Sequence, residues 1–178
     1  MSKVNLPKQV DPIRFAENAA DLHGKLLVKN MPRLVDSLRA PLGDVAVDIQ
    51  FGVDRQGIRH IKGQVQTTLT LECQRCLQAF PYEIASDFSY GLVSSEDEAK
   101  LLPSSYEPVL VQDGILNIQD MIEEELIVNL PIVSMHDPDD CPVKLPLQVA
   151  SDEVAAPKVA KESPFKVIES LKVKPKQE

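Results

Sequence analysis

Apolar and polar residues alternate over long stretches in the middle of the chain, and this pattern constrains the fold more than any other feature. Residues 44–53 and 61–73 each place apolar side chains at every second position. A period of two is typical of strands that bury one face. The polar turn at residues 54–57 between them predicts a hairpin. The residues expected on the buried face are Val45, Val47, Ile49, Phe51, Val65, Thr67, Leu69 and Leu71.

Alternation resumes over residues 79–92, after a short segment that contains two cysteines, so a long strand is expected to reverse between Cys73 and Cys76. A further short strand is expected at residues 106–112. Toward the N-terminus, the pattern predicts a strand over residues 22–28 and a short helix over residues 31–38.

Two helices carry recognisable start signals. Asp11 followed by Pro12 predicts a helix over residues 13–20, with the aspartate as N-cap and the proline in the first turn. Asn117 is expected to cap a helix over residues 118–130, whose apolar residues follow helical spacing and whose Glu123–Glu125 run is expected to face solvent. A polar segment with helix-start chemistry lies at residues 94–100. The predicted fold class is α+β, a curved and mainly antiparallel sheet flanked by a few short helices.

The 178 residues suit one domain with tails. We expect an α+β domain over residues 1–147 and a disordered linker over residues 148–162, where periodicity is lost. Residues 163–178 are expected to form a C-terminal amphipathic helix and basic tail, which either packs back on the domain or docks a partner. The apolar stripe expected to bind that partner comprises Phe165, Ile168 and Leu171.

Charge is distributed unevenly along the chain. Residues 1–80 carry a net charge of +3, residues 81–157 a net charge of −14 and residues 158–178 a net charge of +3. An acidic segment repels phosphate and attracts basic protein partners. Either a solvated acidic face or a protein-binding surface accounts for this pattern. The sequence shows neither a secretory signal nor an apolar run of roughly 20 residues, so we expect a cytoplasmic protein without membrane contact.

The pair Cys73 and Cys76 is the strongest local chemical signal. A CxxC spacing can aim two thiolates into one zinc site, and His136 and Cys141 could complete a Cys3His set. The predicted helix separates the two halves, and no glycine follows Cys76. The sequence therefore favours ordinary cysteines at a strand turn and no cofactor, with structural zinc as the alternative. A redox role is disfavoured because both flanks look like strands and not like a strand followed by a helix.

Patterns typical of enzymes are missing from the sequence, which contains no P-loop, GxGxxG or HExxH motif and only three histidines. The Glu123–Glu125 run does not resemble catalytic carboxylates, because consecutive helical residues diverge by about 100°. We therefore expect no catalytic residues and no small-molecule substrate. A basic strip on the central hairpin could contact RNA phosphates. Its expected members are Arg55, Arg59 and Lys62, together with Arg75 at the cysteine turn.

Five segments, in order, resemble the YceD family of large ribosomal RNA subunit accumulation proteins. They are LPKQVDPIRFAEN, TLECQRCLQAF, LPSSYEPVLV, MIEEELIVNLPIVSMHDPDDC and SPFKVIESLK. The family's marked positions correspond to Cys73, Arg75, Cys76, residues 123–130, His136, Cys141, Pro164, Phe165 and Leu171. The resemblance implies a bacterial cytoplasmic factor needed for the synthesis, processing or stability of 23S ribosomal RNA, and it carries over no catalytic residue.

Together, charge and resemblance predict a non-enzymatic ribosome-biogenesis factor. We expect its acidic middle, with Glu123, Glu124 and Glu125, to bind a basic ribosomal protein or an rRNA-processing factor. The alternative is a direct RNA-binding module that acts through the basic hairpin surface.

Overall fold

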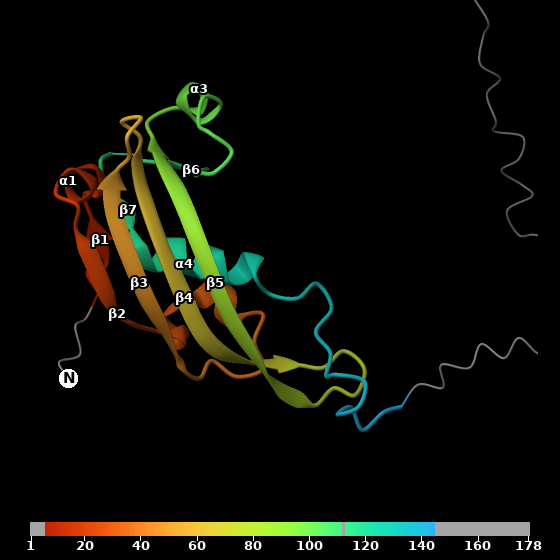
Figure 1. Ribbon diagram of the computed structural model, residues 1–178. Coiled ribbons are helices and arrows are strands. Elements are labelled where there is room, and N and C mark those ends of the chain that lie inside the picture. Colours follow the sequence, from red (N-terminus) through yellow and green to blue (C-terminus); the bar gives the residue numbers. More distant parts are fainter. Residues whose placement is uncertain (1–5, 112, 145–178) are drawn as a thin grey trace, which may run out of the picture. The chain divides into compact units, whose positions relative to one another are not determined.

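A curved sheet of five strands forms the centre of the fold (Figure 1). The computed structural model describes residues 6–111 and 113–144. Its sheet order is β2-β3-β4-β5-β6, with neighbours antiparallel except β5 and β6, which are parallel. The strands are β2 (Asp21–Leu27), β3 (Asp44–Val53), β4 (Arg59–Glu72), β5 (Ala79–Val93) and β6 (Glu107–Leu110). A separate two-stranded sheet pairs β1 (Gln9–Val10) with β7 (Leu116–Asn117).

Short helices accompany the sheet. They are α1 (Pro12–Glu17), the 3-10 turn η1 (Val28–Asn30), α2 (Pro32–Val35), α3 (Glu96–Ala99) and α4 (Ile118–Val128). The predicted α+β class with a mainly antiparallel sheet is confirmed. The predicted linker at 148–162 and helix at 163–178, with Phe165, Ile168 and Leu171, lie outside the described residues. Among the described helices, none combines the length and apolarity that a membrane crossing requires.

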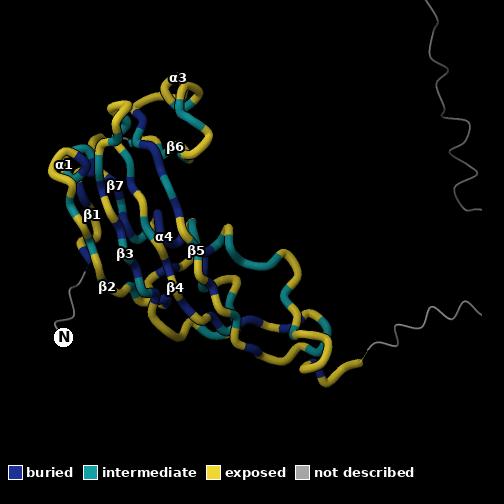
Figure 2. Tube along the Cα trace, viewed as in Figure 1, coloured by how far each residue is buried: buried dark blue, intermediate teal, exposed yellow. Residues whose placement is uncertain are grey.

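The alternating sequence pattern sets which face of the sheet is buried. Most residues at every second position of β3, β4 and β5 are buried, as the dark blue positions along these strands show in Figure 2. Cross-strand partners such as Val47 and Val65 therefore lie on one face and join the core with residues of α4. The opposite face carries polar residues and the surface ion pairs His23–Asp48 and Lys25–Asp44. The predicted buried face of residues 44–53 and 61–73 is confirmed.

One glycine on the buried face is required by a close approach. A Cβ on Gly63 would lie 2.4 Å from the carbonyl oxygen of Asp48 and 2.5 Å from Cζ of Phe88. Phe88 is the cross-strand partner of Gly63, so its ring occupies the space that a side chain at 63 would need. The missing side chain thus lets a large aromatic ring fill the core.

The predicted helix starts are correct, but the helices are shorter than predicted. The Asp11 side chain accepts hydrogen bonds from the N–H groups of Ile13 and Arg14. The helix ends at Glu17, and Ala19 adopts a left-handed φ of 45°. The helix predicted over 31–38 spans four residues, and the one over 118–130 ends at Val128. Hydrophobic periodicity and capping residues therefore predict the start of a helix more accurately than its end, which depends on tertiary contacts.

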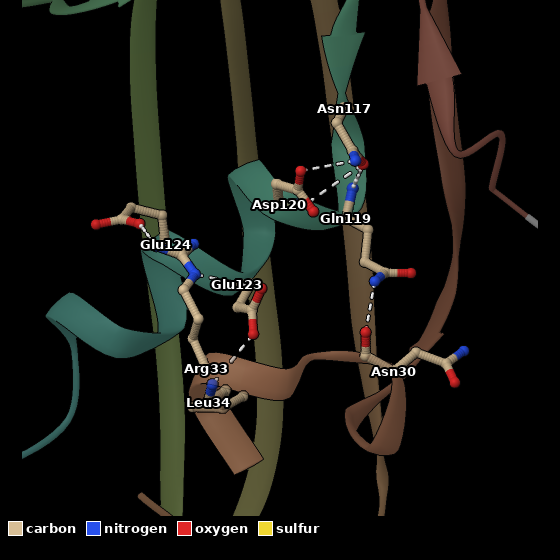
Figure 3. Close-up of polar contacts among 8 residues, drawn as sticks. All are labelled: Asn30, Arg33, Leu34, Asn117, Gln119, Asp120, Glu123 and Glu124. Atoms are coloured by element: carbon tan, nitrogen blue, oxygen red, sulfur yellow. Dashed lines mark hydrogen bonds and ion pairs between the residues drawn. The ribbon is translucent and has the colours of Figure 1, made fainter. Parts of the chain in front are cut away.

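The junction between α2 and α4 overturns one prediction (Figure 3). Glu123 was expected on a solvated helix face, but it is 2% exposed and accepts a hydrogen bond of 3.1 Å from the N–H of Leu34. Arg33 approaches both Glu123 and Glu124, with Nη1 2.7 Å from the Glu124 carboxylate. Met31, the N-cap of α2, makes no side-chain cap hydrogen bond. Glu123 therefore supplies from α4 the acceptor that the first turn of α2 lacks locally.

Candidate metal centre

The tip of the β4–β5 hairpin is a tight turn that aims two thiols in one direction. The N–H of Cys73 donates to the carbonyl of Gln78 at 2.9 Å, and the N–H of Leu77 donates to the carbonyl of Cys73 at 2.8 Å. Leu77 has a left-handed φ of 61°. Glycine is the residue that usually adopts this conformation. The absence of a glycine after Cys76 was one reason why the sequence argued against a zinc site. Here leucine adopts the conformation, so the turn forms without the glycine.

The second half of the centre comes from the segment that follows α4. The N–H of Gln74 donates to the carbonyl of Ser134 at 2.8 Å, which attaches this segment to the hairpin tip. A turn then forms in which the N–H groups of Asp140 and Cys141 both donate to the carbonyl of Asp137 at 3.1 Å. This turn directs Cys141 back toward the cysteine pair.

The four predicted ligand residues meet in one place. One ligand atom from each of Cys73, Cys76, His136 and Cys141 lies within 4.8 Å of the other three. Sγ of Cys76 is 3.4 Å from Nδ1 of His136. In tetrahedral zinc sites, sulfur and nitrogen ligands lie about 2.0–2.3 Å from the ion, so ligand atoms are separated by roughly 3.3–3.8 Å. A small contraction would bring this set to that geometry. The expectation of ordinary cysteines at a strand turn beside a solvated loop did not anticipate that these four residues come together.

The protein environment favours the thiolate form of one ligand. Burial raises the pKa of the Cys73 thiol, but hydrogen bonds from the backbone N–H groups of His136, Cys76 and Arg75 outweigh burial and lower this pKa to about 5. Burial raises the pKa of Cys76, and hydrogen bonding with Cys73 adds to this rise. Backbone donors to a ligand sulfur are the usual outer-shell support of a metal–thiolate bond.

An apolar shell surrounds the ligand set. Cys73 and Cys141 are buried and pack with Leu71 and Phe80 in a small cluster separate from the main core. The Phe80 ring centroid lies 4.9 Å from that of His136, so the two rings pack against each other at the ligand set. Three thiols and one imidazole fill all four positions of a tetrahedral ion, so the chemistry of this set is structural and leaves no open position for a substrate.

Comparisons with known proteins identify the family. Residues 61–172 match the family described as large ribosomal RNA subunit accumulation protein YceD. This chain belongs to the YceD family. It is also 37% identical, over 98% of its length and the whole of the other chain, to the large ribosomal RNA subunit accumulation protein YceD of Haemophilus influenzae. No solved structure matches the chain.

The fold of this YceD family protein does not assemble the predicted basic strip. Arg55, Arg59 and Lys62 lie at one end of β4, and Arg75 follows its other end. Fourteen residues of strand span roughly 45 Å, so Arg75 belongs to a different surface. Arg59 pairs with Glu17 at 3.1 Å, and Nζ of Lys62 lies 5.6 Å from the centre of the Tyr106 ring. The expectation of one continuous strip is wrong, and a smaller surface at the β3–β4 turn remains.

Sequence reasoning missed several residues that shape the centre. Leu77 supplies the left-handed turn, Ser134 accepts the hydrogen bond from Gln74, and Phe80 packs against His136. Nothing in the spacing marks Leu77 or Ser134, because both act through the backbone. Phe80 was identifiable, because the alternation in residues 79–92 places it with Tyr82 on one face of the strand, and it pairs with Leu71 next to the turn.

Proposed function

We propose that this chain is a non-enzymatic accessory factor for accumulation of large-subunit ribosomal RNA, and that it works by binding protein partners on a zinc-stabilised scaffold. The name shared by the family and by the Haemophilus influenzae relative supports the process. The closed Cys3His set carries the scaffold part, because a filled tetrahedral site stabilises structure and activates no water.

In the proposed scaffold, one zinc ion joins the hairpin tip to the segment after α4. Among the described residues, three features connect these two parts besides the ligands: the backbone hydrogen bond from Gln74 to Ser134, a weak contact from the Arg75 guanidinium to the Met135 sulfur at 3.7 Å, and the small cluster around Phe80. Residues 131–144 contain no helix or strand. Metal ligation therefore supplies most of what holds this segment in place.

Metal analysis of the purified full chain tests the zinc. About one equivalent of zinc per chain is expected, lost in Cys73→Ser and in His136→Asn. The matched control is His23→Asn, which removes an exposed histidine of the polar sheet face and should leave the zinc content unchanged. Zinc-free protein from a zinc-supplied preparation would overturn the proposal, as would equal zinc in the His136 and His23 variants.

Partner binding is tested in cells. Deleting the gene should lower the amount of mature 23S ribosomal RNA, and the wild-type chain should restore it. We propose that the Phe165/Ile168/Leu171 stripe docks a partner, so Phe165→Ala/Leu171→Ala should recover fewer proteins in a pull-down than the wild type. Equal recovery of partners would contradict docking by this stripe, and normal 23S levels without the gene would contradict the function itself.

Direct RNA binding is the alternative function, and the dependence of binding on salt distinguishes it from binding to protein partners. If Arg55, Arg59 and Lys62 contacted phosphates, affinity for 23S precursor RNA would fall steeply with ionic strength. It would also fall when these three residues become alanine. Binding that ignores both changes would leave protein partners as the remaining mode of action.

A further inference from the structure

An acidic groove lies between β5, β6 and α4, on the side of the molecule away from β2. It has a volume of about 610 Å³. Apolar lining comes from Pro108, Val109, Leu116, Met121 and Val128, and Val128 is 74% exposed. Four acidic residues, Glu107, Asp120, Glu124 and Glu125, line the groove, and no described lysine or arginine does. Asp87 also borders it, but its side chain belongs to the polar face of the sheet, where Asp87 pairs with Gln64. The groove thus combines an apolar surface with a concentrated negative charge.

Glu125 gives this groove a carboxylate held by neutral groups. It accepts hydrogen bonds from the hydroxyls of Ser86 (2.8 Å) and Tyr90 and from the amide of Asn129 (2.9 Å). Within residues 6–111 and 113–144, no basic side chain forms an ion pair with Glu125. The half-buried carboxylate is therefore fixed in position while its charge is left without a described counter-ion.

The same negative charges act on Tyr90. Burial raises its pKa, and the hydrogen bond to Glu125 and the negative charges of Glu125, Glu107 and Glu124 raise it further. Glu124 is partly neutralised by Arg33. Glu107 and Asp87 form no ion pair with another described residue.

The groove borders the outer edge of β5, which no described strand covers along most of its length. β6 pairs with β5 only over residues 90–93, whereas β4 pairs with β5 over residues 79–91 (Figure 1). The hydrogen bond from Cys73 to Gln78 makes 73 and 78 a hydrogen-bonded pair. Because such pairs alternate along an antiparallel ladder, even-numbered residues of β5 bond to β4 and odd-numbered ones face outward. The N–H groups of Glu83, Ala85 and Asp87 thus point to the open edge.

We propose that this edge and groove bind an extended protein segment in which lysine or arginine alternates with other residues. The segment would add to β5 as a strand in line with β6, through main-chain hydrogen bonds. Side chains alternate between the faces of a strand, so every second residue would project toward α4 and meet the carboxylates. The charge of the groove selects a basic partner and repels nucleic acid. This inference deepens the proposed function by naming the chemistry of a protein partner and the surface that receives it.

Binding of a defined peptide to the full chain tests the proposal. The probe is a short fluorescent peptide of alternating lysine and threonine, and a peptide of alternating glutamate and threonine is the control. Fluorescence anisotropy should show binding of the basic peptide that weakens with added salt and no binding of the acidic one. Amide hydrogen exchange at Ala85 and Asp87 should slow when the basic peptide is bound, which attraction to charge without strand addition would not produce.

Paired charge variants locate the site. Glu107→Gln/Asp120→Asn removes two charges of the groove and should weaken peptide binding about fivefold. Asp21→Asn/Asp36→Asn removes the same charge elsewhere, with Asp21 on the opposite edge strand β2, and should change the affinity less than twofold. Equal weakening by both variants, or unchanged exchange at Ala85 and Asp87, would overturn the proposal.

Two other occupants of the groove would give different experimental results. A second copy in the groove would appear in sedimentation as a dimer whose stability Glu107→Gln/Asp120→Asn changes. Cross-links from groove carboxylates to lysines at 158–176 of the same chain, without peptide binding, would identify the chain's own basic tail. Either result would contradict an external basic segment. Loss of 23S ribosomal RNA on gene deletion would stand in both cases, so failure here is separable from failure of the proposed function.

Discussion

Replacing Glu123 tests whether a residue of α4 caps α2. In Glu123→Ala, the N–H of Leu34 loses its acceptor while remaining buried, since Leu34 is 0% exposed. An unsatisfied buried donor costs about 1–3 kcal/mol, and removing a buried side chain also leaves a small void. Arg33 adds little because it is more than half exposed. We expect Glu123→Ala to lower the free energy of unfolding by about 2 kcal/mol.

Two further variants separate the hydrogen bond from charge. Glu123→Gln keeps an oxygen acceptor for the Leu34 N–H, so a loss of about 1 kcal/mol or less is expected. Glu124→Ala removes the exposed neighbouring carboxylate and should change stability by no more than about 0.5 kcal/mol. Urea unfolding of the metal-loaded full chain measures all three. Equal destabilisation by Glu123→Ala and Glu124→Ala would refute the cap.

Two backbone predictions concern the core and the cysteine turn. Gly63→Ala should destabilise the protein by about 3 kcal/mol, because the new Cβ meets the Asp48 carbonyl and the Phe88 ring; Gly57→Ala, which meets no atom within 4 Å, should cost clearly less in the same urea titration. Leu77→Gly should raise the free energy of unfolding by about 0.5–1 kcal/mol, since glycine adopts φ of 61° without strain. Leu42→Gly, at an equally exposed leucine, should lower it, and a loss at both leucines would contradict the strain.

The strands were predictable because each depends on local alternation. Residues 44–53 matched β3, and the turn after Val53 was placed correctly. The caps Asp11 and Asn117 were predictable for a similar reason, since a cap accepts hydrogen bonds from groups two and three residues away. In each case, the sequence contains both partners within a few residues.

Features that join distant segments could not be predicted in this way. The four ligand types were identifiable, but Cys76 and His136 are 60 residues apart, and the tertiary fold brings them together. Glu123 follows the same logic, because its acceptor role depends on α2, 89 residues earlier. The helical pattern placed the three glutamates on a polar face and could not show that α2 covers part of that face. The distribution of charge along the sequence likewise predicted an acidic segment, but it could not show that part of this charge gathers beside the edge of β5.

The open edge of β5 also affects how the chain behaves toward copies of itself. Unpaired strand edges are sites where identical proteins aggregate. Here Pro81 lacks an N–H, and Glu83 and Asp87 place negative charge along the same edge. Two such edges brought together antiparallel would set acidic residues against acidic residues. The charge that suits a basic segment therefore opposes self-pairing, so the part of this edge that no described strand covers is protected against pairing between identical chains.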